Sequence, residues 1–280
     1  LSSFCALTFS AFCILAKGFV ETKPVLEKVV AVVCSDVLPL NLVVADLGWF
    51  RLFPFQSVHL FHSSFSLHWH SQFPDGLDGN KGNIYIARTT PPSVVKLYQE
   101  QFQKDLMLFL ELRDEELALG GQMVLTFLGR KNEDVYSGNM NYLYELLGQS
   151  LQCLVEKDLV NQKKLDSLNL PIYGASVAEV KEVVNRNRLF DINHIKLFES
   201  NWDPYNDSED KKVLDSIQSG VNVAKSIRVV METLFVSHFG ESMIDAFFKE
   251  FANKVAEYLQ REDNTKYSVI VLSLKRKCQA

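Results

Sequence analysis

The sequence lacks the short motifs by which several enzyme classes are recognised. It has no Gly-x-x-x-x-Gly-Lys loop, no Gly-x-Gly-x-x-Gly turn and no Gly-x-Ser-x-Gly elbow. These absences argue against a P-loop nucleotide site, a dinucleotide fingerprint and a hydrolase nucleophile. The six histidines stand in no order typical of a catalytic triad, so hydrolase chemistry has little support.

Paired cysteines, clustered metal ligands and excess basic charge are also missing. The five cysteines have no Cys-x-x-Cys spacing, which favours reduced thiols of a cytoplasmic protein over disulfides or zinc. The four histidines between positions 59 and 70 alternate along an expected strand, so they would not converge on one ion. The net charge is −5 with dispersed basic residues, and no nucleic-acid partner is expected.

A long hydrophobic run is absent as well. Residues 1–16 are apolar and uncharged, but this stretch is shorter than the roughly 20 residues of a membrane span and no basic segment precedes it. We expect a core-facing or poorly folded segment there, rather than a targeting signal or a membrane anchor.

What is present indicates a soluble globular protein with alternating helices and strands. The 280 residues are 47% apolar and 22% charged, as in one large or two small domains. Periodicity predicts helices over 17–35, 92–118, 141–158, 162–168, 177–187, 214–234 and 240–260. Apolar or alternating runs predict strands over 41–48, 57–64, 122–129, 191–200 and 267–274. This alternation is typical of the α/β class.

Two glycine-containing positions give more specific expectations. Gly120-Gly121 should end the helix that begins at Pro92. The apolar strand over 41–48 contains Asp46 followed by Gly48, an arrangement found at cofactor-binding strand ends but more often at plain turns. A parallel strand needs a crossover connection, yet the next expected strand begins at Ser57 after a bulky segment.

The most chemically varied stretch is 60–69. It begins in the expected strand, at whose end lie two hydroxyls, Ser63 and Ser64, followed by the rings of Phe65, His68 and Trp69. Hydrogen-bonding groups beside flat aromatic surfaces suit a small-molecule pocket at the carboxyl end of a strand. The alternative interpretation is that Trp69 is a core anchor and His68 a satisfied surface histidine.

This stretch resembles the signature of the plant SABATH methyltransferases, which include salicylate, benzoate and jasmonate carboxyl methyltransferases and the caffeine-pathway N-methyltransferases. The resemblance is continuous from about Arg51 to the end. The matching segments are 22–27 (TKPVLE), 44–48 (VADLG), 62–69 (HSSFSLHW), 71–74 (SQFP), 80–85 (NKGNIY), 101–105 (QFQKD), 123–130 (MVLTFLGR), 164–171 (KLDSLNLP) and 237–241 (SHFGE).

The resemblance implies a Rossmann-like S-adenosylmethionine domain with an α-helical cap, usually in a homodimer. The cofactor domain would comprise 17–130 and 190–280, and the cap 131–189 with part of 201–240, while 1–16 lies outside the family pattern. Such enzymes methylate the carboxylate or a ring nitrogen of a small plant metabolite such as salicylate, benzoate, jasmonate or a xanthine.

The resemblance also assigns cofactor and substrate residues. Asp46 and Ser64 would lie near the cofactor, and Phe65, His68 and Trp69 would contact the substrate. Phe65 stands where the family commonly has Tyr. Methyl transfer from a sulfonium to an anionic oxygen needs no general base, so His68 and Trp69 would act by positioning, an effect worth up to about 7–11 kcal/mol in ideal cases.

A second set of residues matches a magnesium-associated group in the family: Asn80, Asp166, Leu168 and Asn169. Mg²⁺ is therefore a further expected cofactor. The alternative interpretation of these positions is a group of helix caps and turns, which Asp and Asn also favour.

The sequence departs from the family after Gly48. The family's tight CSSGPN loop is replaced by Trp49-Phe50-Arg51, and the following strands, with the acid that holds the cofactor ribose, have no counterpart. The missing part corresponds to about one or two βαβ units, which predicts a truncated sheet with an exposed apolar edge. Two hypotheses follow: a working methyltransferase, or an inactive, degenerate paralogue that keeps the cap but cannot bind the cofactor.

Overall fold

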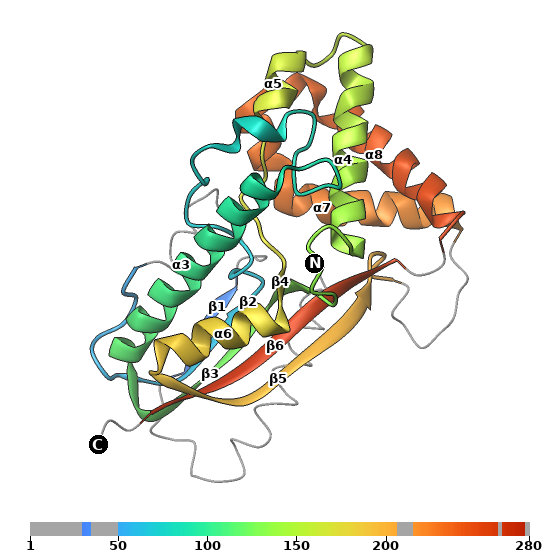
Figure 1. Cartoon of the computed structure of the whole chain (residues 1–280). Helices are drawn as coiled ribbons and strands as arrows, with labels where there is room; N and C mark the ends of the chain where they lie inside the picture. The colour runs from blue at the N-terminus through green and yellow to red at the C-terminus, as the bar shows by residue number, and fades with distance from the viewer. Residues whose placement is uncertain (1–29, 35–49, 206–214, 263–264, 278–280) are drawn as a thin grey trace.

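The strands form one mixed sheet that organises the chain. A computed structural model describes residues 30–34, 50–205, 215–262 and 265–277. The strand order is β1 (Val30–Cys34), β2 (Val58–Ser64), β3 (Leu117–Arg130), β6 (Lys266–Arg276) and β5 (Phe190–Asn201), with β4 (Ala175–Ser176) beside the end of β3 (Figure 1). The first three strands and β4 run parallel, whereas β6 is antiparallel to both neighbours. The expected α/β class is confirmed.

The centre of the sheet is built from buried apolar strands. Phe61 of β2 and Leu125 and Phe127 of β3 are at most 1% exposed. A strand covered on both faces is selected to be nearly continuously apolar. This is why the sequence predicted both strands, although β3 begins earlier than expected.

Two helices, α3 (Pro92–Glu116) and α6 (Val177–Asn187), cover one face of the sheet (Figure 1). The ring of Phe109 on α3 meets Phe61 on β2 edge-on, with centroids 5.9 Å apart. Helix α6 begins with a capping box in which Ser176 and Glu179 satisfy each other's backbone N–H, an arrangement that fixes the start of a helix.

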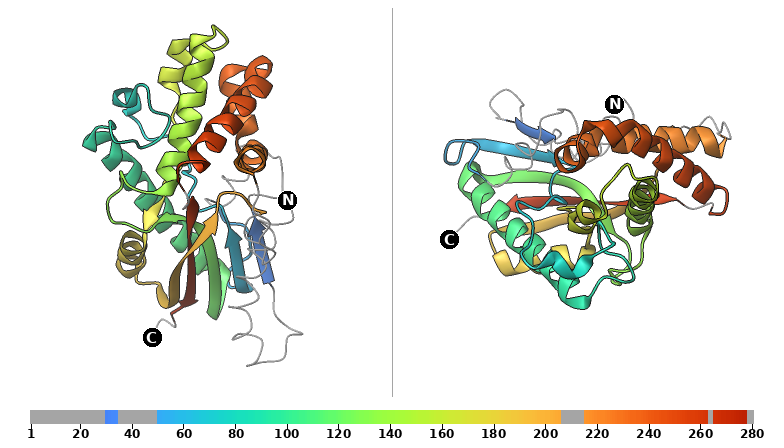
Figure 2. Two further views of the ribbon diagram at one scale, coloured as in Figure 1. Left: turned by 90° about the vertical axis from the view of Figure 1, so that its right-hand side faces the viewer. Right: turned by 90° about the horizontal axis from the view of Figure 1, so that it is seen from above.

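The remaining helices stand beyond one end of the sheet (Figures 1 and 2). They are α4 (Asn139–Glu156), α5 (Gln162–Ser167), α7 (Ser216–Phe239) and α8 (Ile244–Leu259), with short 3₁₀ turns η2 (Leu77–Asn80) and η3 (Glu241–Met243). Since β3 leads directly toward α4, these helices lie at the carboxyl ends of the parallel strands. The predicted helices near these positions are confirmed, and α7 continues to Phe239, five residues beyond its predicted end.

The prediction that Gly120-Gly121 ends the first long helix is wrong. Helix α3 ends at Glu116 and passes directly into β3, so both glycines lie within the strand. The pairing of β3 with β2 shifts register here. Gly120 has a φ of +71°, and a Cβ on Gly121 would lie 2.8 Å from the Ala118 carbonyl oxygen. The glycines therefore permit an irregularity of the strand.

The predicted helix over 17–35 is wrong where it can be compared. Val30–Cys34 forms strand β1, parallel to β2. The run VAVVC is rich in β-branched residues, which favour strands, and β2 provides a hydrogen-bonding edge that a sequence window cannot reveal. The predictions for 1–29 and for the strand over 41–48, with Asp46, lie outside the described residues.

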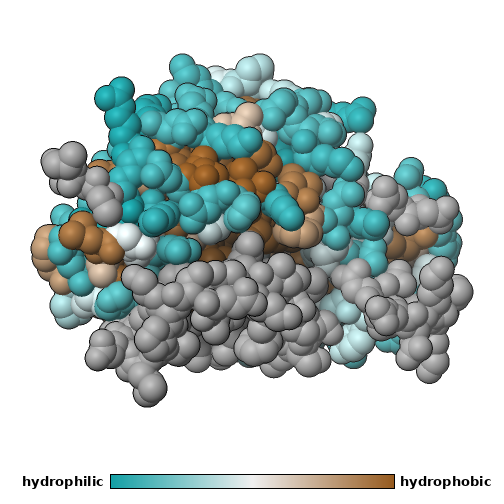
Figure 3. Space-filling view, turned by 90° about the horizontal axis from the view of Figure 1, so that it is seen from below, coloured by the Kyte–Doolittle hydropathy of each residue, from teal (hydrophilic) through white to brown (hydrophobic). Residues whose placement is uncertain are grey.

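The side of the molecule opposite α4 and α5 carries apolar surface. In Figure 3 apolar side chains gather in the middle of this face, bordered by hydrophilic ones. Phe55 and Leu119, near the starts of β2 and β3, are 61% and 64% exposed. Within the described ranges, no helix has both the length and the apolar character needed to cross a membrane.

Candidate functional site

The candidate site begins where β2 ends. Phe65 follows the strand with a φ of +53°, a conformation that costs a non-glycine residue energy and often marks functional turns. Its backbone N–H donates to the Thr126 carbonyl of β3 over 2.7 Å. Ser63 and Ser66 face each other across the turn, with hydroxyl oxygens 2.5 Å apart. The turn after β2 is thus held by a backbone hydrogen bond to β3 and by the contact between the two serine hydroxyls.

Three residues predicted to contact substrate come together in this turn, and we call them the aromatic wall: Phe65, His68 and Trp69. The ring of Phe65 meets His68 edge-on at 6.4 Å, and the ring of His68 lies 5.7 Å from Trp69 at 40°. Phe65 and His68 are each 5% exposed, whereas Trp69 is partly exposed. His68 is therefore buried and is not the surface histidine of the alternative interpretation.

A distant segment, the strut (Pro171, Ile172 and Tyr173), pairs with the wall. The His70 N–H donates to the Pro171 carbonyl over 2.7 Å, and the Tyr173 N–H donates to the His68 carbonyl over 2.8 Å. Trp69 and Ile172 form an antiparallel bridge between them. The backbone of the wall is consequently positioned by residues about one hundred places later in the chain.

Burial keeps the histidines of the turn neutral. Desolvation, together with the nearby His70, lowers the pKa of His68 to about 3, and desolvation lowers the pKa of His70 to about 4. His68 Nδ1 and both ring nitrogens of His70 have no hydrogen-bond partner among the described residues. The site therefore offers neutral imidazole to a ligand, without positive charge.

Of the two residues predicted to lie near the cofactor, Ser64 and Asp46, the structure describes Ser64. Ser64 is the last residue of β2, is fully buried and is in register with Thr126. This is the carboxyl end of a parallel strand, the end at which ligands of open α/β sheets bind; contact of Ser64 with the cofactor stays a prediction. Asp46 lies outside the described residues.

Within the predicted magnesium set, the side chains of Asn80 and Asn169 contact each other. The Asn80 amide nitrogen donates to Asn169 Oδ1 over 2.9 Å, and Asn80 Oδ1 accepts the Thr90 hydroxyl at 2.7 Å. Asp166 instead accepts from Gln162 at 2.9 Å. Oxygen ligands suit Mg²⁺, but here an amide donor occupies the space between the two side-chain oxygens.

Leu168, the fourth member, is buried and its backbone N–H donates to the Leu165 carbonyl at the end of α5. Among the described residues, no three His, Cys, Asp or Glu side chains cluster in a way that could hold a metal. The Asn80 and Asn169 side chains bond to each other, and the expectation of Mg²⁺ stays a prediction that rests on the resemblance.

The sequence analysis missed the polar network behind the strut. Arg130, the last residue of β3, is 5% exposed and forms an ion pair with Glu179 over 2.8 Å. The Tyr173 hydroxyl lies between them, 2.9 Å from the arginine and 2.7 Å from the glutamate. The pattern Ser176-x-x-Glu179 is a capping-box signature and was the one available signal for part of this network.

Comparisons with known proteins agree with this architecture. A family model described as SAM dependent carboxyl methyltransferase matches residues 49–277. A benzoate O-methyltransferase of Zea mays is 58% identical over 237 residues, covering 81% of this chain and 61% of the relative. A relative from the same species, named inactive anthranilate O-methyltransferase 1, is 55% identical over 229 residues, covering 81% and 60%.

A solved structure of a loganic acid methyltransferase with SAH has a TM-score of 0.72 and 31% identity, over 83% of this chain and 65% of that one. This chain spans about 60% of the length of the two Zea mays relatives. The family resemblance of the wall and its neighbouring segments is confirmed. The chain belongs to the family of SAM-dependent carboxyl methyltransferases.

Proposed function

We propose that this chain methylates the carboxylate of a small aromatic acid of the benzoate type, with S-adenosylmethionine as methyl donor. The observation that carries the proposal is the aromatic wall at the carboxyl end of β2, beside Ser64. The relative at 58% identity is named a benzoate O-methyltransferase, which supports this class of acid.

S-adenosylmethionine, when bound, supplies a methyl group on a positively charged sulfur; the carboxylate oxygen forms the new O–C bond as the S–C bond breaks, and no proton moves. The task of the protein is therefore to orient the acid and exclude water. Trp69 provides a flat, partly exposed face for the aromatic ring of the acid. Such ring pairs contribute about 0.5–1.5 kcal/mol beyond area burial.

His68 suits this chemistry because it is neutral. An imidazole with a pKa of about 3 carries no charge at physiological pH. It can donate a hydrogen bond to the carboxylate without providing a counter-ion. The reaction neutralises the negative carboxylate and the positive sulfonium. A site that gives these separated charges only weak stabilisation therefore favours the transition state over the bound reactants.

The test is methyl-ester formation by the purified full chain. Benzoate, anthranilate, salicylate, jasmonate and a xanthine are each incubated with S-adenosylmethionine, and products are identified by mass spectrometry. We expect esters of the benzoate-type acids. Trp69→Ala should reduce the rate at least tenfold, whereas Phe198→Ala, which removes a 50% exposed ring on β5, should leave it unchanged.

The alternative is an inactive remnant that keeps the fold without binding the cofactor. Its support is the departure from the family after Gly48 and a similarly related protein that is named inactive. Calorimetric titration with S-adenosylmethionine separates the two proposals. Micromolar binding contradicts the remnant; a folded chain that neither binds nor methylates contradicts the enzyme.

We further propose the domain division expected from the resemblance, with 17–130 and 190–280 as cofactor domain and 131–189 with part of 201–240 as cap. The position of α4 and α5 beyond the sheet supports the cap (Figure 1), whereas α6 lies within 131–189 but covers a face of the sheet together with α3. We also propose a homodimer, on the family pattern, and light scattering of the purified chain measures the oligomeric state. A cytoplasmic location is proposed on the cysteine usage, and imaging of a tagged chain tests it.

A further inference from the structure

We propose that Tyr173, Arg130 and Glu179 form a positioning network that sets where His68 and Trp69 stand in the acid site. The inference deepens the methyl-transfer function proposed above and rests on it. None of the three residues needs to touch the acid, because they act through the strut.

The first step is the dependence of the wall on the strut. His68, Trp69 and His70 follow the end of β2 and lie beyond its ladder with β3. Their backbone is instead bonded to the strut by the His70 N–H and the His68 carbonyl, at 2.7 and 2.8 Å. A displacement of the strut therefore displaces the wall.

The second step is the anchoring of the strut at Tyr173. This side chain is fully buried. Its ring stacks on His70 at 6.4 Å and 26°, and packs on Phe102 of α3 at 5.5 Å. Ring packing fixes the plane of Tyr173 but leaves sliding within that plane less restricted, so a directional contact at the hydroxyl is needed to fix its position.

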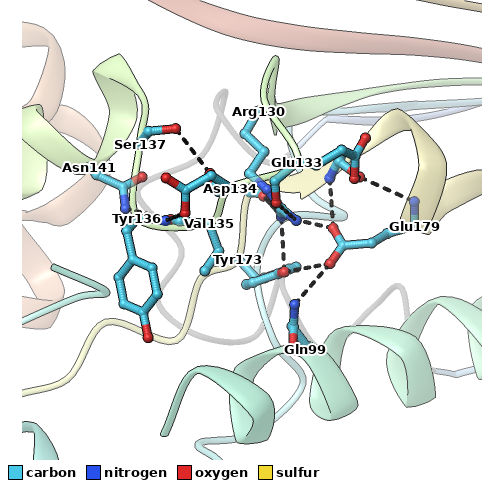
Figure 4. Close-up of polar contacts among 12 residues, drawn as sticks. Gln99, Arg130, Glu133, Asp134, Val135, Tyr136, Ser137, Asn141, Tyr173 and Glu179 are labelled. Carbon is cyan, nitrogen blue, oxygen red and sulfur yellow. Dashed lines mark hydrogen bonds and ion pairs between the residues drawn. The ribbon is translucent and has the colours of Figure 1, made fainter. Parts of the chain in front are cut away.

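The third step is the directional contact. Figure 4 shows Arg130 and Tyr173 converging on the carboxylate of Glu179, where Gln99 of α3 donates to Oε1, the same oxygen that accepts the Tyr173 hydroxyl. Arg130 Nη1 donates to the Tyr173 hydroxyl and, over 2.7 Å, to the Gly174 carbonyl next in the chain. One guanidinium thus holds both the side chain and the backbone of the strut.

The network joins three elements of the fold. Arg130 ends β3, Glu179 lies in the first turn of α6, and Gln99 belongs to α3. The ion pair is little exposed, at 5% for Arg130 and 15% for Glu179. Charge-assisted hydrogen bonds are shorter and stronger than neutral ones, so the sheet and both covering helices define where the strut, and with it the wall, can lie.

The test uses Tyr173→Phe, which keeps the buried ring and removes the bridging hydroxyl. Tyr136→Phe is the matched control, because the Tyr136 hydroxyl donates to the Thr90 carbonyl over 3.2 Å in a neighbouring loop. Each variant loses one tyrosine hydroxyl, which has contacts with Arg130 and Glu179 at Tyr173 and with Thr90 at Tyr136. Initial rates give KM for the acid and for S-adenosylmethionine separately, and hydrogen exchange follows peptides containing 66–70 and 171–174.

We expect Tyr173→Phe to raise the KM for the acid about tenfold, less than the roughly hundredfold loss that a 1 Å misplacement can cause, with the cofactor KM within about twofold. Exchange in 66–70 should accelerate in Tyr173→Phe and not in Tyr136→Phe. Arg130→Lys should show a smaller shift than Arg130→Met, since it keeps the charge opposite Glu179.

Equal effects of the two tyrosine variants, or equal changes in both KM values, would overturn the inference and leave only a structural role. If the wild-type chain forms no ester, the proposed function fails on its own. The exchange comparison still decides whether the network holds the wall, because it requires no turnover.

Discussion

Arg113 and Glu116 form an ion pair over 2.8 Å in which neither side chain is exposed to solvent. Glu116 also accepts hydrogen bonds from the backbone N–H groups of Leu52 and Phe53, and Arg113 donates to the Phe50 carbonyl. The pair therefore fastens the segment in which the family pattern begins to the end of α3.

Arg113→Met should lower the free energy of unfolding by about 3–5 kcal/mol, because Glu116 would be left buried without its counter-ion. Urea denaturation measures the loss. The control is Arg51→Ala, which breaks a pair with Glu115 whose side chains are 46% and 55% exposed; there we expect about 0–1 kcal/mol. Similar losses in both variants would contradict the dominant role of the buried pair.

His70→Leu should stabilise the protein, most strongly in acid. His70 is 4% exposed and lies between the rings of Tyr98 and Tyr173. Replacing its ring by an aliphatic side chain removes buried nitrogens that have no partners among the described residues. We expect the free energy of unfolding to rise by about 1–3 kcal/mol. Thermal or urea unfolding measures the gain.

The pH dependence of the same variant follows from linkage. The folded pKa of His70 is about 4, below the unfolded value, so the unfolded state binds the proton first as pH falls. Wild-type stability is therefore lost from about pH 6.5 down to about pH 4, and the advantage of Leu should grow by about 2 kcal/mol between pH 8 and pH 5. His194→Gln, on the exposed side of β5, is the control. If the extra stability of His70→Leu did not change with pH, His70 would not be the source of the acid dependence.

The rate of methyl transfer should show no inflection from His68 between about pH 5.5 and 8.5. Its pKa of about 3 leaves the ring neutral throughout this range. His68→Phe should reduce kcat/KM by about ten- to a hundredfold, as expected for one lost hydrogen bond to a charged group, and His68→Gln by less. A wild-type inflection near the ordinary histidine pKa that disappears in His68→Gln would contradict a neutral donor.

Asn80→Ala should cost about 1–3 kcal/mol of stability whether or not Mg²⁺ is present. The substitution leaves Asn169 and the Thr90 hydroxyl, both buried, without the partner they have now. Millimolar Mg²⁺ should leave the Tm of the wild type unchanged. A rise in Tm that is absent from Asp166→Ala would instead support the magnesium set.

The sequence predicted the elements whose patterns are local. The strands around Phe61, Leu125 and Ile270 are continuous apolar runs because the sheet is covered, and α6 has both periodicity and a capping box. The family signature also located the wall, whose members stand within five positions of one another.

The errors arose where a partner elsewhere in the chain decides the outcome. Val30–Cys34 becomes a strand because the edge of β2 is available, and Gly120-Gly121 serves the irregular pairing of β3 rather than a helix end. The strut, the burial of His70 and the hydrogen bond between Asn80 and Asn169 each depend on contacts over long sequence separations. No spacing within a single segment encodes them.

The wall is joined to the strut through carbonyl oxygens and amide N–H groups, so its framework does not depend on which side chains point toward a ligand. Positions 68 and 69 can therefore be exchanged, by selection or by design, without dismantling the turn that presents them. A library of variants at these two positions could therefore be screened for binding of different acids on one unchanged backbone.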